Sequence, residues 1–349
     1  MKAFAYLSNG QAGWIEKERP QATGFDAVIR PLMVAPCTSD VHNVEINCLK
    51  PDRILGHEGL GEIVEVGELV RDFQVGEIVA IPPVTPDWRT VPSQLGAHQH
   101  CSGLITGQKL SNSEDGLMAE YALIRDIDAN AARIPANVSW EAAVMAADML
   151  NTGLYGAELA DVQPGDTVVV MGIGPVGLMA VAGARLRGAG RIIAIGSRPH
   201  CVELAKLYGA TDIVNYKEGD VERQVHLLTD KQGADCCICA GGGSDALGQA
   251  VAMVRWGGTV GNVNYFTTYG DLPLNNVRYG FGMGNKTIRG GECPGGRARM
   301  ERLLKLIQYG RVDPTPLITH RFTGLDQVEA AFHLMARKPP ALVKTNVTL

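Results

Sequence analysis

A glycine-rich turn after an apolar strand is the feature that most constrains the fold of this chain. Residues 167–171 read TVVVM and residues 172–177 read GIGPVG, after which a helical pattern begins. A strand that leads through such a turn into a helix is the setting in which this glycine pattern binds a dinucleotide. Its glycines permit a tight turn, close approach of the backbone to a pyrophosphate, and close packing of helix on strand. The alternative is a turn with only a structural role. We expect cofactor contacts from Gly172, Gly174, Pro175, Val176 and Gly177.

Strand and helix patterns alternate from residue 167 onward. The strand patterns are TVVVM, RIIAIG, DIVNY, ADCCICAG and GTVGNVNY, with helical stretches between them. Such alternation predicts a doubly wound parallel sheet of the Rossmann type. The first third instead has short apolar runs separated by glycine and proline, at residues 26–36, 61–67 and 76–84, which indicate a β-rich barrel or sandwich.

The chain is long enough for two domains, because its 349 residues exceed the roughly 250–300 at which one hydrophobic core stops growing. We therefore expect an α/β protein with a β-rich domain and a doubly wound domain. After residue 292 comes a basic amphipathic helix, RARMERLLKLIQYGRV, and then a tail. The pattern leaves open whether this last part packs on the parallel sheet or returns to the first domain.

Charge and composition favour small-molecule chemistry. The formal net charge of −5 gives no basic excess, so we expect neither nucleic acid nor an anionic membrane surface as a partner. Residues 168–184 contain no charged side chain, but their glycines and Pro175 fit a strand, a turn and a helix better than a membrane span. The 8 cysteines form no compact framework and no secretory signal is visible, so we expect a cytoplasmic protein with reduced thiols.

The residues after the second strand of the series indicate which nicotinamide cofactor binds. An NAD enzyme presents an acidic residue there, whereas this chain reads Gly196-Ser197-Arg198. Ser197 can donate a hydrogen bond to a 2′-phosphate and Arg198 can make charge-assisted ones, so we predict NADP(H). Arg198 could instead be a solvated surface charge. Tyr216 could lie against the adenine or phosphate, or be a buried residue at a strand end. We also assign to this site two residues at the end of the last strand pattern, Asn264 and Tyr265.

Two segments offer metal ligands. Cys37 and His57 supply a thiolate and an imidazole, which suit zinc, and a catalytic zinc needs a third ligand and an open position. Asp148 lies in the apolar run AAVMAADMLNTG, where an acidic side chain needs a compensating partner, and we assign it as that third ligand. A helix-capping or surface role is the alternative for Asp148.

Several unlinked motifs resemble one family in order. Cys37 with residues 38–40, the GHE segment at residues 56–58, Asp148, the glycine turn, and the GSRP and CPGGR stretches are similar to the medium-chain zinc alcohol dehydrogenases. Within that family the whole chain is most similar to the microbial NADP-dependent secondary alcohol (isopropanol) dehydrogenases. The resemblance implies a GroES-like catalytic domain at residues 1–151, a Rossmann NADP-binding domain at residues 152–292, and a segment at residues 293–349 that returns to the catalytic domain. It also implies a homotetramer.

The resemblance also implies a site. It places one catalytic Zn²⁺ per subunit on Cys37, His57 and Asp148, with Glu58 as a fourth, exchangeable ligand, and a small secondary alcohol or ketone as the substrate. It places a proton relay on Ser39 and His42. The spacing of Ser39 and His42 agrees with such a relay, because positions three apart share one side of a helical turn. Thr38 could serve in place of Ser39. A zinc ion would polarise a carbonyl or lower the pKa of an alcohol.

Other polar clusters do not predict a second metal site. In His98-Gln99-His100-Cys101 we expect a strand, whose alternating side chains point to opposite faces. We interpret Cys236, Cys237 and Cys239 as core residues of a central strand. Relatives with a structural zinc use four cysteines in one loop, and between residues 85 and 120 this chain has only Cys101, so we predict no structural zinc.

The chain departs from its near relatives at two positions of the expected substrate pocket. Gln108 replaces a bulky aromatic residue and Glu292 replaces an apolar one, which favours a larger or more polar ketone. This keeps open a zinc dehydrogenase for polyols or amino alcohols. A zinc-free quinone or enone reductase would not need Cys37, His57 and Asp148 together, and a non-catalytic NADP-binding protein would be expected to have lost at least one of them.

Replacing Arg198 with alanine should raise the KM for NADP far more than the KM for NAD, because only NADP carries the 2′-phosphate. A hydrogen bond to a charged group contributes about 1.5–3 kcal/mol, which corresponds to roughly a ten- to hundredfold change. Steady-state kinetics with both cofactors measures the difference, and equal changes in the two constants would contradict the phosphate role.

Overall fold

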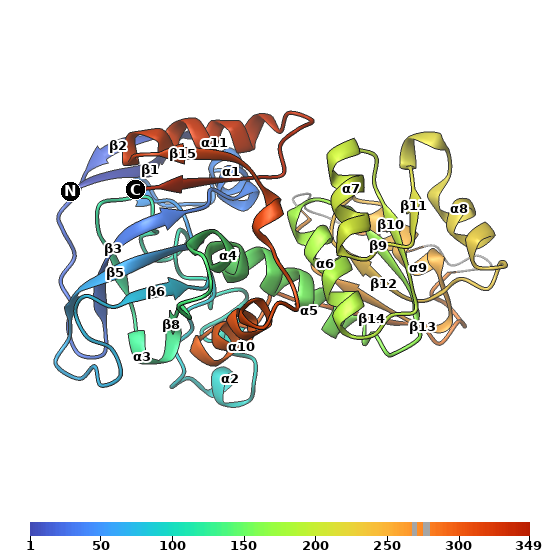
Figure 1. Ribbon diagram of the computed structural model, residues 1–349, viewed down its shortest axis with the longest axis horizontal. Coiled ribbons are helices and arrows are strands. Elements are labelled where there is room, and N and C mark those ends of the chain that lie inside the picture. The colour runs from blue at the N-terminus through green and yellow to red at the C-terminus, as the bar shows by residue number, and fades with distance from the viewer. Residues whose placement is uncertain (267–270, 275–279) are drawn as a thin grey trace. The chain divides into compact units, whose positions relative to one another are not determined.

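The computed structural model describes residues 1–266, 271–274 and 280–349, and the chain divides into two compact units. The first unit contains Met1–Asp148 together with Pro294–Leu349, and the second contains Met149–Cys293. Both ends of the chain therefore belong to the first unit, where Figure 1 marks them beside its strands.

The first unit is built on two sheets. Its strands are β1 (Lys2–Ser8), β2 (Gln11–Glu16), β3 (Ala27–Val34), β4 (Arg53–Ile54), β5 (Gly59–Val66), β6 (Ile78–Ile81), β7 (Ala122–Ile124), β8 (Ala132–Arg133), β15 (Ile318–Thr323) and β16 (Lys344–Thr348). The larger, seven-stranded sheet has the order β15-β16-β3-β5-β6-β8, with β7 also paired to β3, and the smaller one has the order β2-β1-β4. The three apolar runs of the first third form β3, β5 and β6, as the sequence predicts.

Short helices connect and cover these strands. They are α1 (Thr38–Glu45), α2 (Val91–Gln94), η1 (His98–His100), α3 (Ile127–Asn130), α4 (Trp140–Met145), α10 (Arg297–Gln308), η4 (Thr315–Leu317), η5 (Leu325–Gln327) and α11 (Val328–Arg337). A π-helical turn, η2 (Ala146–Leu150), follows α4 directly. Such turns recur at functional sites, because the extra residue changes the direction in which a side chain points.

The C-terminal segment completes the core of the first unit. Phe332 of α11 and Val347 of β16 belong to the same buried cluster as Phe4 and Ile29. The ring of Phe4 meets those of Trp14 and Phe332 edge to face, each at 5.4 Å between centroids. Burial of apolar side chains from both ends of the chain holds β16 beside β3, with which it pairs antiparallel.

The second unit is the predicted doubly wound sheet. Its strands are β9 (Thr167–Met171), β10 (Arg191–Ile195), β11 (Asp212–Val214), β12 (Ala234–Cys239), β13 (Val254–Asn262) and β14 (Thr287–Gly290). The strands have the order β11-β10-β9-β12-β13-β14, and every neighbouring pair is parallel. Successive strands are added on one side of β9 up to β11 and on its other side from β12 onward. Sheets of this kind bind ligands at the carboxyl ends of the strands where the order switches sides, here between β9 and β12. The α/β fold with a β-rich domain and a Rossmann domain is confirmed.

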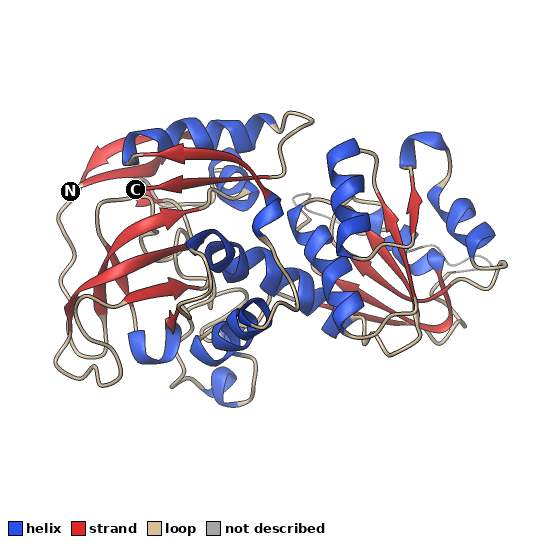
Figure 2. Cartoon of the chain, in the orientation of Figure 1, coloured by secondary structure: helices blue, strands red, loops and turns tan. Residues whose placement is uncertain are grey.

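Helices flank this sheet on two sides, as Figure 2 shows. They are α5 (Asn151–Leu159), α6 (Pro175–Leu186), α7 (Pro199–Tyr208), η3 (Tyr216–Glu218), α8 (Val221–Leu228) and α9 (Ala246–Met253). Residues 168–184 form β9, the glycine turn and most of α6, as expected. Within the described ranges, no helix is both long enough and apolar enough to cross a bilayer.

Two predicted strands differ in extent from the structure. The strand expected at DIVNY ends at Val214, because the Asn215 side chain accepts a hydrogen bond from the Lys217 backbone and begins η3. The strand expected at GTVGNVNY ends at Asn262, so Asn264 and Tyr265 lie in the loop beyond β13. In both cases a local polar contact or a loop replaces the last residues of the pattern.

The glycine turn has the close contacts that its motif requires. Gly172 has a φ of +86°, and its backbone N–H donates to the carbonyl of Ile195 on the neighbouring strand β10. A Cβ at Gly177 would lie 1.7 Å from the Gly172 carbonyl oxygen, whereas a Cβ at Gly174 would have no protein atom within 4 Å. Gly177 is thus needed for packing, and the space beside Gly174 is open.

Gly177→Ala should lower the free energy of unfolding by about 1–3 kcal/mol, because the new methyl group must displace backbone. Gly174→Ala is the matched control: it should leave stability unchanged and weaken cofactor binding, since its methyl group fills the space that we expect the pyrophosphate to occupy. Denaturant unfolding and cofactor titration of both variants measure this, and equal stabilities would contradict the packing role of Gly177.

Candidate metal centre and nucleotide pocket

The first ligand candidate is positioned by the start of α1. Cys37 follows the end of β3 by three residues, is 8 % exposed, and is the N-cap of α1. Its backbone N–H donates to Asp40 Oδ2 over 3.2 Å, so a carboxylate in the first helical turn holds the backbone that carries the thiol. The helix start thereby fixes the position of Cys37.

Asp40 also orients His57, which immediately precedes Glu58 and β5. The His57 Nδ1–H donates to Asp40 Oδ1 at 3.1 Å, which leaves Nε2 as the metal-binding nitrogen. The fully buried Asp40 accepts two more hydrogen bonds, from Ser111 Oγ at 2.8 Å and from the Gly56 backbone at 3.3 Å. Burial raises the pKa of Asp40, but His57 and the hydrogen bonds to Ser111 and Cys37 lower it overall, so Asp40 is a carboxylate.

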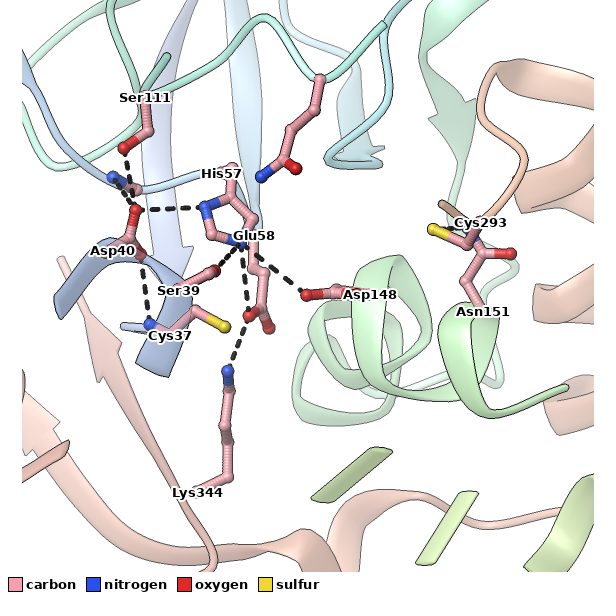
Figure 3. Close-up of polar contacts among 12 residues, drawn as sticks. Cys37, Ser39, Asp40, His57, Glu58, Ser111, Asp148, Asn151, Cys293 and Lys344 are labelled. Atoms are coloured by element: carbon pink, nitrogen blue, oxygen red, sulfur yellow. Dashed lines mark hydrogen bonds and ion pairs between the residues drawn. The ribbon is translucent and has the colours of Figure 1, made fainter. Parts of the chain in front are cut away.

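The remaining donors meet His57 Nε2. Asp148, on the π-helical turn η2, places Oδ2 at 3.7 Å from this nitrogen, and Glu58 places Oε1 at 3.9 Å. Figure 3 shows the three side chains and the thiol of Cys37 directed toward one another. One ligand atom from each of Cys37, His57, Glu58 and Asp148 lies within 4.8 Å of all the others. The structure therefore brings together all four residues that the sequence analysis selected.

The chemistry of these donors fits a zinc ion. Thiolate, imidazole and carboxylate are the ligand types of zinc sites. Burial raises the pKa of Cys37, but the nearby Lys344 and His57 lower it overall to about 7, so the thiolate is accessible at neutral pH. Burial, together with the charges of Cys37 and Asp148, raises the pKa of Glu58 well above its ordinary value. A divalent cation would relieve this crowding of negative charge.

The predicted relay residues lie on the first turns of α1. Ser39 Oγ is 3.3 Å from His57 Nε2, so its hydroxyl lies at the metal cluster. His42 is half-exposed, and its Nδ1 is 3.4 Å from Glu45 Oε2. Thr38 is partly buried beside them. In the part of the chain that the structure describes, no hydrogen bond joins Ser39 to His42, so a relay through both needs a bridging hydroxyl or water.

The second unit contains a pocket of about 690 Å³ at the carboxyl ends of its strands. It is lined by the glycine turn, the end of β10, the start of η3, and the loops after β11 and β12: Met171, Gly172, Ile173, Gly174, Ile195, Gly196, Ser197, Arg198, Tyr216, Gly219, Asp220, Val221, Glu222, Gly241, Gly242, Gly243, Asp245 and Gln249. Pro175, Val176 and Gly177 form the first turn of α6, whose N-terminus attracts phosphate.

The end of β10 presents hydrogen-bond donors to this pocket. Ser197 Oγ is buried, and among the described residues it has no hydrogen-bond partner. Arg198 is half-buried at the N-cap of α7. Tyr216 is 55 % exposed and lines the pocket, so the alternative of a buried strand-end tyrosine is wrong. A buried hydroxyl and a guanidinium fit a phosphate ester.

Asn264 and Tyr265 lie outside the lining of this pocket. The Asn264 side chain donates to the carbonyl of Gly242, which does line it, at 3.3 Å, and Tyr265 is 53 % exposed. Of the two departures noted in the sequence, Gln108 belongs to the first unit and Glu292 to the second, and both are half-buried.

The strand expected at His98–Cys101 is wrong. These residues form the 3₁₀ helix η1 and its end, because the chain turns tightly after α2. Each imidazole has a structural partner: His98 stacks on Trp88 at 4.8 Å and accepts a hydrogen bond from the Gly295 backbone, and His100 accepts one from the Ile105 backbone. By contrast, Cys236, Cys237 and Cys239 lie in the central strand β12 as predicted, and burial raises the pKa of all three thiols.

Sequence reasoning missed three residues of the metal centre. Asp40 was read only as part of a motif, while Ser111 and Lys344 were not selected at all. Lys344 is 1 % exposed, and its Nζ donates to Glu58 Oε1 at 2.6 Å. The only signal in the sequence was a lysine inside the short apolar strand pattern of the tail, since lysine is almost never fully buried unless it is paired.

Comparisons with known proteins agree with this geometry. Residues 23–136 match the alcohol dehydrogenase GroES-like domain, and residues 175–309 match the zinc-binding dehydrogenase family. A parallel-sheet nucleotide domain and a GroES-like domain with a thiolate, imidazole and carboxylate cluster define a zinc-dependent dehydrogenase. The chain belongs to the zinc-binding alcohol dehydrogenases, and the predicted family and zinc cofactor are confirmed.

Individual relatives are similar over their full length. The chain is 56 % identical to the NADP-dependent isopropanol dehydrogenase of Thermoanaerobacter brockii and 52 % identical to that of Clostridium beijerinckii, in each case over 100 % of both chains. Among solved structures it is similar to alcohol dehydrogenase TADH from Thermus sp. ATN1, with a TM-score of 0.87 and 28 % identity over 100 % of this chain and 99 % of that one.

Asp40→Asn should weaken zinc binding by about ten- to hundredfold, because partners that orient a metal ligand typically contribute that much to affinity. The amide keeps only one acceptor oxygen, so its NH2 group would face either the Cys37 N–H or the donors from Gly56, His57 and Ser111. Ser111→Ala is the control, since it removes one hydroxyl and keeps the carboxylate. Zinc content after dialysis against a chelator, with circular dichroism to verify folding, measures both, and undiminished zinc in Asp40→Asn would contradict the orienting role.

Proposed function

We propose that this protein catalyses reversible hydride transfer between NADP(H) and a small secondary alcohol or ketone at a zinc site formed by Cys37, His57 and Asp148, with Glu58 as an exchangeable ligand. The observation that carries the proposal is the convergence of these four donors within 4.8 Å. When bound, zinc supplies a Lewis acid for the substrate oxygen, and the nicotinamide supplies or accepts the hydride. The names of the two full-length relatives support the cofactor and the substrate class.

NADP(H) as the cofactor is supported by the pocket of the second unit. The buried Ser197 hydroxyl and the Arg198 guanidinium would bind the 2′-phosphate, which a carboxylate at that position would repel. The open space beside Gly174 would admit the pyrophosphate at the start of α6. Asn264 and Tyr265 would complete the cofactor site from the loop after β13.

The proton of the alcohol would leave through the first turn of α1. Ser39 would accept it beside the metal ligands while it releases its own hydroxyl proton through a bridging hydroxyl or water to His42, which would pass a proton to solvent. Thr38 is the alternative hydroxyl. His42 suits this role because it is half-exposed and an imidazole can both accept and donate a proton.

A polar alcohol is the second candidate substrate class. Gln108 and Glu292 are the residues that favour it, because the family resemblance implies that both positions belong to the substrate pocket, where polar side chains bind polar substrates. In a zinc dehydrogenase acting on a polyol, these side chains would bind substrate hydroxyl groups.

Domain roles and assembly complete the proposal. We assign residues 1–151 and 293–349 to the catalytic domain and residues 152–292 to the NADP-binding domain. We also propose a cytoplasmic homotetramer, as the family resemblance implies. Light scattering of the purified protein measures the subunit number.

Asp148→Ala should abolish turnover and weaken zinc retention while leaving NADPH affinity nearly unchanged, because it removes a metal ligand and alters no residue of the cofactor pocket. Turnover would be assayed with NADPH and a panel containing acetone, longer ketones and keto forms of polyols, and zinc by elemental analysis. Glu203→Ala, at an exposed position of α7, is the control and should behave as the wild type. Unchanged turnover in Asp148→Ala would overturn the ligand assignment, and activity only on the polyol-type substrates would favour the second candidate.

A further inference from the structure

The metal centre contains one donor too many for a catalytic site. Four donor atoms, from Cys37, His57, Glu58 and Asp148, lie within 4.8 Å of one another. Four protein ligands close a zinc site, as in structural zinc centres, whereas a catalytic zinc keeps one position for water or substrate. Something in the protein must therefore prevent Glu58 from being a permanent ligand.

Lys344 is the group that competes for Glu58. It is the first residue of β16, and its side chain is 1 % exposed while that of Glu58 is fully buried. Lys344 Nζ donates to Glu58 Oε1 at 2.6 Å, as Figure 3 shows, and this is the same oxygen that lies 3.9 Å from His57 Nε2. The other oxygen, Oε2, is buried and has no hydrogen-bond partner within the described part of the chain.

The backbone that carries Lys344 is held in place. Lys344 pairs with Ile318 of β15, and Val347 and Thr348 at the other end of β16 pair with β3, so the strand is anchored in the seven-stranded sheet. An ammonium ion removed from water attracts a carboxylate much more strongly than an exposed one does.

We propose that Lys344 is a positioning residue that draws the Glu58 carboxylate away from the metal and so keeps the fourth coordination position available to the substrate oxygen. The inference rests on the proposed ligand set of Cys37, His57 and Asp148. It assigns to the last strand of the chain a role in setting the coordination number of the metal. Without the ammonium, Glu58 would have only the metal as a partner for its buried charge, and the site would close.

This role differs in sign from a purely structural one. If Lys344 only stabilised the fold around the site, its removal would loosen the centre and speed the loss of zinc. If it withholds Glu58 from the metal, its removal adds a permanent ligand and slows the loss of zinc while turnover falls.

The test compares zinc-loaded wild-type protein with Lys344→Met, which keeps the aliphatic length, and with Lys344→Arg, which keeps the charge. We expect zinc transfer to an excess chelator to be about tenfold slower in Lys344→Met, within the range by which neighbouring groups alter metal affinity. In Co²⁺-substituted protein, added imidazole, a probe of an open metal position, should shift the visible absorption bands of the wild type and not those of Lys344→Met. Lys344→Arg should restore the imidazole response.

A double-mutant cycle isolates the interaction with Glu58. In Glu58→Gln protein, adding Lys344→Met should no longer change zinc transfer or the imidazole response. If Lys344→Met does not fold, Lys344→Gln is measured in the same way. Zinc transfer as fast as or faster than in the wild type, with an unchanged imidazole response, would overturn the inference and leave the proposed function intact. Wild-type protein that binds no zinc would overturn both.

Discussion

The buried carboxylate of Asp40 is the contact on which the metal centre depends. A fully buried charge is costly unless it is hydrogen-bonded, and Asp40 meets that requirement through donors from three separate segments: the Cys37 backbone, the Gly56 backbone with the His57 ring, and the Ser111 hydroxyl. The same hydrogen bonds fix the backbone of one metal ligand and the ring orientation of another. The Asp40 side chain thus holds three separate segments together and fixes the positions of Cys37 and His57.

The other half of the centre is organised by charge. Glu58 and Asp148 bring carboxylates to a place from which water is largely excluded, and the ammonium of Lys344 and the imidazole of His57 face them. The π-helical turn gives Asp148 its direction, and the core shared by α11, β16 and the N-terminal strands delivers Lys344. The C-terminal segment is therefore part of the metal centre as well as of the first unit, because the charge balance of the site includes a residue of its last strand.

The nucleotide pocket is organised by different forces. Backbone geometry shapes this pocket: glycines, which lack a Cβ atom, permit the turn between β9 and α6, and helix N-termini direct N–H groups toward the pocket. Side-chain chemistry enters at Ser197 and Arg198, where hydrogen-bond donors replace the acidic residue of NAD enzymes. In the proposed cofactor site, backbone geometry thus provides binding, and the proposed preference for NADP(H) depends on two side chains at the end of β10.

Much of this protein follows from local sequence. The period of apolar residues predicted the strands and helices of the doubly wound sheet, the glycine spacing predicted the turn of the pocket, and the residue types at Cys37, His57, Glu58 and Asp148 identified the ligand candidates. Local pattern failed where a tight turn replaced an expected strand, at His98–His100, and it left open where the tail packs. The buried pair of Lys344 and Glu58 joins positions 286 residues apart, and Asp40 and Ser111 are 71 apart. Only the tertiary structure decided these partnerships, because the partner of a buried charge is chosen by three-dimensional packing, which periodicity and spacing do not encode.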